Sequence, residues 1–288
     1  MQHRRVEASN DVREVNMPLI TITQSIGCDG LAVARRVAED LNVGLYDDSK
    51  LKEEAIRMGL DVGKLEGFPQ KASAWFNRLM GDKPEIYANL MGSVIYETAR
   101  SGEGVIIGHG SQMLLQDFSC AMHVLVTASK ERRISNLTKL MNLSREVAEK
   151  VVHKSDNQNK EFFRYVFHRD RDDPSLYDLC VNPGKIGIER SSQTIVETAG
   201  YPELKACNIY ALDAIERLSQ TKRIEASLSE LDLKPLGLVV EVPEKGVVHI
   251  SGILLHHEDK ERIPKVVRGI PGVERVDMDV MVMPTEYG

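Results

Sequence analysis

A glycine-punctuated turn is the first segment of this chain whose residue types and spacing suit a chemical function. It consists of Gly27, Cys28, Asp29, Gly30 and Leu31, between a short apolar run and a helical pattern. Glycine allows positive φ and close approach of a ligand, and the free amides and dipole at the start of a helix favour a phosphate. The turn contains no lysine, which a Walker A loop carries. We predict a phosphate cradle made of backbone amides, and the alternative is an ordinary strand-to-helix turn that binds nothing.

A run of aromatic and basic side chains is the second candidate. It extends from residue 160 to 174. One interpretation is a helix that packs its rings inward and leaves its charges in solvent. The other is a lid whose cations close over phosphates when water is excluded. The cations of this part of the chain that could hold a nucleotide are Lys154, Lys160, Arg164, Arg169 and Arg171.

Alternating strands and helices must position these residues. The predicted strands are 19–23, 43–46, 105–108, 122–126 and 176–181. The predicted helices between and after them are 31–41, 50–58, 84–100, 129–141, 144–153 and 186–198. This alternation predicts an α/β fold with parallel strands and right-handed crossovers, whose ligands bind at the carboxyl ends of the strands. The same rule brings residues 27–30, Asp47 and His109 to one edge of the sheet.

Composition and charge exclude several classes of protein. The chain has 288 residues, is 42% hydrophobic and carries a net charge of −6, which argues against a general nucleic-acid-binding protein. It contains no apolar run long enough to span a membrane, and its first residues are too polar for a signal peptide. We therefore expect a cytoplasmic protein without a transmembrane segment.

The four cysteines predict neither a zinc site nor a disulfide framework. Cys28, Cys120, Cys180 and Cys207 are widely separated and form no close pair of the kind that zinc sites use. Cys28 lies at a predicted helix start, where a thiol can have a lowered pKa and become prone to oxidation. The simpler interpretation, which we prefer, is a small residue tolerated in a tight loop.

With these elements placed, residues 19–198 resemble the cytidylate kinase-like family, a branch of the P-loop nucleoside monophosphate kinases. The resemblance depends on the element order, on the sequence Gly-His-Gly at 108–110, and on the strand Tyr-Asp-Leu-Cys-Val at 177–181 followed by Asn182. It implies a P-loop kinase-like parallel sheet flanked by helices. It also implies ATP and Mg²⁺ as co-substrate and cofactor, and a nucleoside monophosphate as acceptor.

The resemblance also implies roles for individual residues. Residues 27–30 match the phosphate loop, and Asp47 matches the acidic position that ends the second strand near the acceptor. His109 follows the third strand on the acceptor side. Asp156 matches the aspartate of the lid motif, and Arg133 lies on the basic helix before the lid, where it would support the phosphates.

Three departures from the family pattern each weaken a cation aimed at phosphate. Gly30 is followed by Leu31 instead of arginine, His109 stands in place of an arginine, and Asn159 stands where the lid carries another. Losing one such donor costs about 3 kcal/mol of transition-state stabilisation. Two hypotheses follow: an ATP-dependent phosphotransferase, and a catalytically weak or inactive nucleotide-binding regulator. An assembly scaffold is a third, with less support.

The C-terminal segment has a pattern of its own. We expect helices at 206–218 and 224–231, a hairpin turning at 244–246, a helix at 258–268 and a strand at 273–283. Residues 221–284 resemble a BON domain, which implies binding of lipid surfaces or partner proteins. Nine basic and twelve acidic residues after position 220 argue against an anionic membrane. A protein partner, a small ligand or self-association as a homo-oligomer remain open. The predicted division is a tail at 1–16, a kinase-like domain at 17–220 and this domain at 221–284.

Overall fold

The computed structural model describes residues 19–60, 84–201, 204, 207–231, 233 and 236–283. The tail predicted at 1–16 lies outside the described residues. So does the segment from residue 61 to 83, for which the sequence predicts no element.

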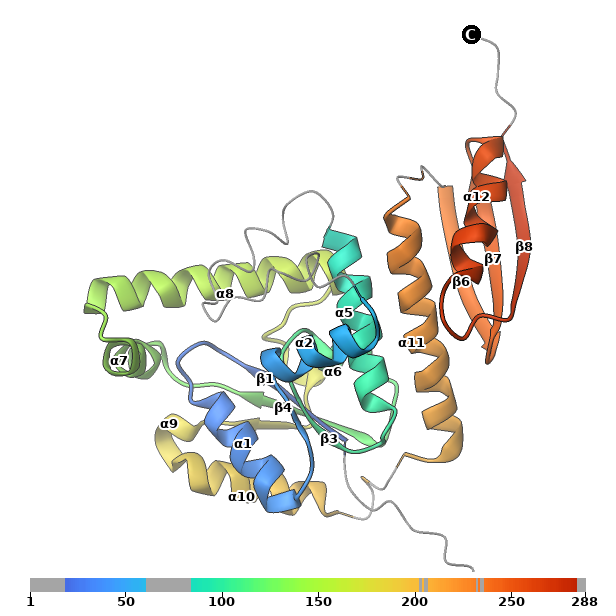
Figure 1. Ribbon diagram of the computed structural model, residues 1–288. Coiled ribbons are helices and arrows are strands. Elements are labelled where there is room, and N and C mark those ends of the chain that lie inside the picture. Colours follow the sequence, from blue (N-terminus) through green and yellow to red (C-terminus); the bar gives the residue numbers. More distant parts are fainter. Residues whose placement is uncertain are drawn as a thin grey trace, which may run out of the picture.

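A five-stranded parallel sheet forms the centre of the N-terminal part, as predicted (Figure 1). Its order is β2-β3-β1-β4-β5. The strands are β1 (Leu19–Gln24), β2 (Leu45–Tyr46), β3 (Gly104–Ile107), β4 (Ala121–Val126) and β5 (Leu179–Val181). The fifth strand is shorter than predicted because Pro174–Leu176 forms a 3₁₀ helix instead.

Helices cover both faces of this sheet, which explains the continuous apolar character of its strands. The covering helices are α1 (Gly30–Leu41), α2 (Asp48–Arg57), α5 (Pro84–Ala99) and α10 (Ile188–Ala199), with the short α6 (Ser111–Leu114) and α9 (Pro183–Ile186) in connections. On one face Ile20 and Ile22 pack with Val33 of α1. On the other face Leu19 packs with Ile95 of α5. The sheet therefore has a hydrophobic core on each side, and only its strand ends are open to a ligand.

Helices α7 (Lys130–Met141) and α8 (Arg145–Phe167) stand beyond the carboxyl edge of the sheet. The prediction of a helix that stops near residue 153 is wrong, because α8 is 23 residues long and ends at Phe167. Phe162 and Phe163 are buried, and both rings lie edge-on or tilted against Phe167 at centroid distances of 5.7 and 5.4 Å. Up to residue 167, the aromatic and basic run is thus a helix whose phenylalanine rings pack inward, whereas Tyr165 is exposed.

The C-terminal part is built on one long helix, α11 (Ile209–Ser229), and not on the two helices predicted there. In Figure 1, α11 lies between α5 and a small three-stranded sheet. That sheet has the order β6-β7-β8, with β6 (Leu236–Glu244) antiparallel and β8 (Arg275–Val282) parallel to β7 (Val247–Leu254). Helix α12 (His257–Arg268) precedes β8. The hairpin, the following helix and the final strand are confirmed.

Continuity of α11 has a simple physical cause. Ile215 packs into the core beside α5, whereas Ile224 and Leu228 pack into the core of the small sheet. The helix therefore buries one side against each neighbour, and the apolar pattern changes face at the point where the sequence suggests a break.

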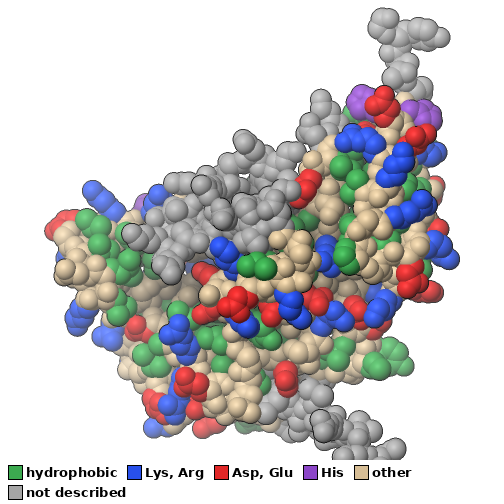
Figure 2. All heavy atoms as spheres, viewed as in Figure 1, with side chains coloured by type: hydrophobic (Ala, Val, Ile, Leu, Met, Phe, Trp, Pro, Cys, Tyr) green, Lys and Arg blue, Asp and Glu red, His purple; other side chains and the backbone are tan. Residues whose placement is uncertain are grey.

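The described surface mixes both signs of charge. On the face drawn in Figure 2, Lys and Arg side chains alternate with Asp and Glu, including over the C-terminal elements. In the described part of the chain, no helix is long and apolar enough to cross a lipid bilayer.

The sequence predicts no disulfide framework, and the structure corrects this for one pair of cysteines. Cys120 and Cys207 are disulfide-bonded, with their Cα atoms 4.9 Å apart. Cys120 lies directly before β4 and Cys207 directly before Asn208, which caps α11. A separation of 87 residues hides this proximity in the sequence, because only the packing of α11 against the sheet domain brings the two thiols together.

Removing this bond should loosen α11 from the sheet domain. In the chain-entropy account, a disulfide that closes a long loop contributes about 2–4 kcal/mol, because it restricts the unfolded chain. We expect Cys207→Ser to lower the free energy of unfolding by about that amount in urea titrations monitored by circular dichroism. Cys180→Ser, which removes an exposed free thiol, is the control and should leave stability unchanged. Equal stability of both variants would contradict a stabilising role for the bond.

Candidate functional site

The turn after β1 has a conformation that requires glycine. Gly27 has φ of +80°, and a Cβ atom added there would lie 2.7 Å from the carbonyl oxygen of Arg133. Gly30 begins α1, and its added Cβ would lie 2.6 Å from Oε1 of Gln24. Asp29 precedes the helix with φ of 65°. The turn, residues 25–29, thus packs closely against α7 at Gly27, and the first residue of α1, Gly30, packs closely against β1. Neither glycine position has room for a side chain.

Its backbone leaves several amides available at the helix start. Among the described residues, the amides of Gly27, Asp29 and Leu31 donate to no backbone carbonyl. The Cys28 amide is used within the turn, where it donates to Ser25 O at 3.2 Å. The Gly30 amide also donates to no described backbone carbonyl, but it is directed at the Cys28 sulfur. Three of the five amides predicted for the cradle therefore remain for an anion, together with the dipole of α1.

Cys28 itself is structural. It is 1% exposed, and its Sγ donates to Val126 O at 3.2 Å. Burial raises the pKa of the Cys28 thiol, although the amides of Gly30 and Ser25 act in the opposite direction. The hypothesis of a lowered pKa is thus wrong, because desolvation in the core outweighs the helix start.

Two side chains of helix α7 donate hydrogen bonds to carbonyl oxygens of the turn. Arg133 Nε donates to Ile26 O at 2.7 Å, and Asn136 Nδ2 donates to Gly27 O at 3.0 Å and to Asp29 Oδ2 at 2.8 Å. The Arg133 guanidinium also forms a bidentate ion pair with Asp156 of α8, at 3.0 and 2.7 Å. All three nitrogens of this buried guanidinium donate to protein acceptors, so Arg133 positions the turn.

A second buried guanidinium, Arg171, lies on the other side of the turn. Arg171 is 4% exposed and donates to Gln24 O at 2.5 Å. The carbonyl of Arg171 accepts a hydrogen bond from Tyr177 Oη at 2.8 Å. Its nearest described carboxylate is Asp172, at 3.6 Å, which also pairs with Lys160 at 3.1 Å. The charge of Arg171 is therefore less neutralised than that of Arg133. The sequence marks this residue only as one of several cations after α8.

His109 lies at the same edge, after β3. It has φ of 56°, in the left-handed region that few residues other than glycine adopt. Its Nε2 is 2.9 Å from Asp48 Oδ1, and its Nδ1 is 3.0 Å from Tyr87 Oη. The surrounding protein desolvates Asp48 and acts to raise its pKa, but the hydrogen bond and charge of His109 outweigh this and lower that pKa.

Asp47, the residue predicted for the acceptor side, caps a helix in the structure. Its Oδ1 accepts from the backbone amide of Lys50 at 3.1 Å and so caps α2. Asp48, one residue later, is the carboxylate that contacts His109. The sequence signal, two consecutive aspartates after a strand, did not distinguish the cap from the contact residue.

The other predicted cations are not brought to the turn. Lys154 and Arg164 are exposed on α8, Arg169 is exposed just after it, and Lys160 pairs with Asp172. Among the described residues, none of these four makes a side-chain hydrogen bond to residues 25–31. Arg133 alone of the predicted catalytic residues contacts the turn directly.

The residues present fit the phosphates of a nucleotide better than they fit a bare metal ion. The amides of the turn suit a phosphate, as argued above. In the described part of the chain, no group of three or more His, Cys, Asp or Glu side chains could hold a metal. Ala32 stands where a Walker loop places a metal-binding Ser or Thr. Mg²⁺ is usually held by substrate phosphates and only one or two protein carboxylates. A site with few protein ligands therefore suits a metal that arrives bound to a nucleotide.

Comparisons with known proteins agree with this geometry. The cytidylate kinase of Pyrobaculum islandicum is 25% identical over 173 residues, which are 60% of this chain and 87% of that protein. The cytidylate kinase of Staphylothermus marinus is 26% identical over 183 residues, or 63% of this chain and 96% of the relative. The crystal structure of an uncharacterised protein from Eubacterium ventriosum has a TM-score of 0.51 at 19% identity, and the match covers 64% of this chain and 98% of that chain. This last likeness concerns the fold alone.

A family profile matches the part of the chain that carries the site. The match is to the cytidylate kinase-like family and extends from residue 19 to 185, which includes the turn, His109, Arg133 and Arg171. The parallel sheet flanked by helices, the glycine turn at the start of α1 and this match lead to the same result: the chain belongs to the cytidylate kinase-like family, a family of nucleotide kinase-like phosphotransferases.

Proposed function

We propose that this protein transfers the terminal phosphoryl group of ATP to a nucleoside monophosphate, with Mg²⁺ as the cofactor. The observation that carries the proposal is the turn at residues 25–29 with the start of α1. The carbonyl oxygens of Ile26 and Gly27 are held by α7, and the amides of Gly27, Asp29 and Leu31 remain available. Phosphoryl transfer depends mainly on positioning and on neutralising charge, and both can be supplied by fixed amides and nearby cations.

Arg171 takes the role of the missing loop lysine in this proposal. It is a buried cation beside β1, and its partial pairing with Asp172 leaves positive charge at the edge where the phosphates would lie. Arg133 acts as a positioning residue through Ile26. Bound Mg²⁺ would supply further charge neutralisation at the phosphates. The acceptor phosphate provides its own attacking oxygen, so no side chain has to act as a nucleophile.

The acceptor binds near Asp48 and His109 in this account. His109 is fixed from both ring nitrogens, by Asp48 and by Tyr87 of α5. A carboxylate in the first turn of α2, directly after β2, suits the hydroxyl and amino groups of a nucleoside.

The rival hypothesis is a regulator that binds ATP without turnover. It is favoured by Leu31, His109 and Asn159, which stand where the family pattern has cations. Measuring phosphoryl transfer from MgATP to CMP, UMP, AMP and GMP, beside thermal shifts with ATP, separates the two. Turnover supports the kinase, and stabilisation by ATP with no product above the uncatalysed rate supports the regulator.

For the C-terminal part, we propose a BON-like unit over residues 221–284 that binds a protein partner, a small ligand or a second copy of the chain. The order of helix, hairpin, helix and strand, with a mixed three-stranded sheet, supports this proposal. The proposed boundary at residue 220 falls inside α11, so the unit shares that helix with the kinase-like part.

Gly27→Ala should abolish the cradle. Its Cβ would collide with the carbonyl of Arg133 in a conformation with positive φ, so the turn must move and its amides lose their direction. We expect ATP affinity, measured by isothermal titration, to fall by about tenfold or more. The control is Gly200→Ala, because Gly200 ends α10 with φ of −77° and an added Cβ makes only ordinary contacts. Unchanged ATP affinity in Gly27→Ala would contradict the amide cradle.

Arg171→Met should reduce the rate of transfer more than the binding of either substrate. Loss of one charge-stabilising donor typically lowers kcat by about 100-fold. Arg190→Met, at an exposed position of α10, is the matched control and should keep the wild-type kcat. Because removing a buried guanidinium can impair folding, Arg171→Lys is measured in parallel and should retain part of the rate. A folded Arg171→Met enzyme with wild-type kcat would show that another group replaces the lysine.

Asp48→Ala should change the KM for the acceptor, whereas Asp47→Ala should change the stability of the fold. Asp48→Ala removes the His109 contact, and we expect the KM for the acceptor to rise by about tenfold while the KM for MgATP is unchanged. Asp47→Ala removes the cap of α2 and should cost about 1 kcal/mol of stability with little change in either KM. The reverse result, an effect on acceptor KM from Asp47 only, would restore the prediction made from the sequence.

A further inference from the structure

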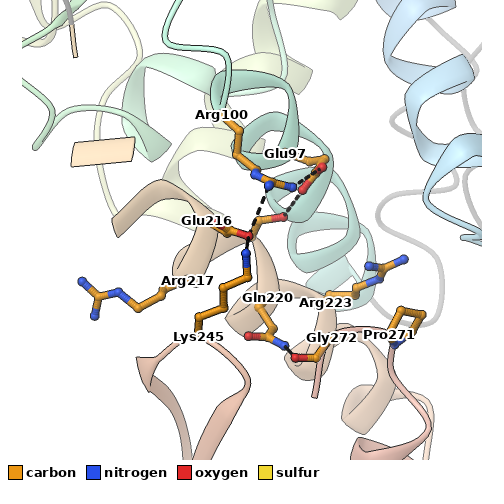
Figure 3. A pocket seen from close by; sticks show the side chains of 10 residues that line it. Glu97, Arg100, Glu216, Arg217, Gln220, Arg223, Lys245, Pro271 and Gly272 are labelled. Carbon is orange, nitrogen blue, oxygen red and sulfur yellow. Dashed lines mark hydrogen bonds and ion pairs between the residues drawn. The ribbon is translucent and has the colours of Figure 1, made fainter. Parts of the chain in front are cut away.

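A pocket lies away from the glycine turn, where the sheet domain meets the C-terminal elements. Its volume is about 270 Å³. Its walls come from the end of α5, from the middle of α11, and from the turns before β7 and β8, as Figure 3 shows. The lining residues are Glu97, Arg100, Glu216, Arg217, Ser219, Gln220, Arg223, Lys245, Pro271 and Gly272.

Basic side chains outnumber acidic ones in this lining. Four of the ten residues are Lys or Arg, and two are Glu. Arg100 pairs with Glu97 at 2.7 Å and with Glu216 at 3.1 Å, and Lys245 pairs with Glu216 at 2.9 Å. A single oxygen of Glu216, Oε1, thus serves two cations from two different parts of the chain. In Figure 3 these four side chains point toward one another across the pocket.

The two remaining arginines are held mainly by carbonyl oxygens. Arg217 NH1 donates to Pro243 O at 3.1 Å, and its Nε pairs with Asp213, which does not line the pocket. Arg223 donates to Met58 O, and among the described residues no carboxylate lies within ion-pair distance of it. Desolvation lowers the pKa of Arg223. A carbonyl does not neutralise a guanidinium, so Arg223 gives the pocket a positive charge that no described carboxylate balances.

We propose that this pocket binds a small polyanion, a metabolite with two or more phosphate or carboxylate groups. Such a ligand would share Arg100 and Lys245 with Glu216 and bring compensating charge to Arg223. The volume lies near the lower limit of ligand pockets, about 300 Å³, which suits a compact anion better than a whole nucleoside triphosphate.

The pocket exists only while two parts of the chain are docked. Arg100 belongs to α5 of the sheet domain, whereas Lys245 and Gly272 belong to turns of the C-terminal sheet. Gln220 of α11 already joins the two by donating to Gly272 O at 2.8 Å. A ligand that binds only the docked arrangement stabilises it by mass action. The pocket thus makes docking of the C-terminal elements sensitive to the concentration of the anion.

The test uses the full chain with its disulfide intact and two probes, sodium pyrophosphate and citrate. Each is titrated by calorimetry in the presence of a saturating non-hydrolysable ATP analogue, which occupies the glycine turn. The double variant Arg217→Gln with Lys245→Gln removes two exposed or half-exposed cations of the pocket. The double variant Lys260→Gln with Arg268→Gln makes the same change in net charge on exposed positions of α12.

We expect the wild type and the α12 variant to bind one equivalent of at least one probe, and the pocket variant to bind it at least about tenfold more weakly. Binding of pyrophosphate but not citrate would assign phosphate groups, and the reverse would assign carboxylates. The proposal is overturned if neither probe binds the wild type, or if the two variants bind equally. This readout requires no phosphoryl transfer, so it stands or falls separately from the proposed kinase activity.

Discussion

The ion pair between Arg133 and Asp156 is the interaction on which the rest of the site depends. It holds a buried guanidinium under the turn, where Nε binds Ile26 O, and Asn136 of the same helix binds Gly27 O. With the carbonyl oxygens of the turn held by α7, its free amides are left for a ligand at the start of α1. A buried arginine without its carboxylate is strongly unfavourable, by about 3–5 kcal/mol for a broken pair. The pair therefore couples the long α8 helix to the geometry of the phosphate cradle.

The same edge of the sheet shows how the chain departs from a lysine-based phosphate loop. In the proposed site, positive charge comes from Arg171 beside β1, a residue distant in sequence from the turn. On the proposed acceptor side, Asp48, His109 and Tyr87 are joined by hydrogen bonds through the two ring nitrogens of His109. Tyr87 lies near the start of α5. Arg100 directly follows the end of that helix and lines the pocket proposed for a polyanion. A single rigid element thus spans the acceptor side and the boundary with the C-terminal sheet.

Much of the fold could be predicted from the sequence because its signals are local. The strand, glycine turn and helix at residues 19–41 follow from periodicity and from the need for glycine at position 27, and the C-terminal hairpin follows from alternation around its turn. The features that could not be predicted depend on contacts between residues far apart in the sequence. Two consecutive aspartates divide into a cap and a His109 partner only when β3 lies beside β2. Likewise, Cys120 meets Cys207 only because α11 packs against α5, and Arg171 differs from the exposed Arg169 only through burial.

The central claim is that backbone amides of one turn hold the phosphates of ATP although the loop lysine is absent. Amide-resolved NMR of the ¹⁵N-labelled chain, titrated with the Mg²⁺ complex of a non-hydrolysable ATP analogue, tests it most directly. The account predicts the largest shifts at the amides of Gly27, Asp29 and Leu31, and a much smaller shift at Cys28, whose amide is already bonded to Ser25. Saturable binding of the analogue with those three resonances unmoved would contradict it.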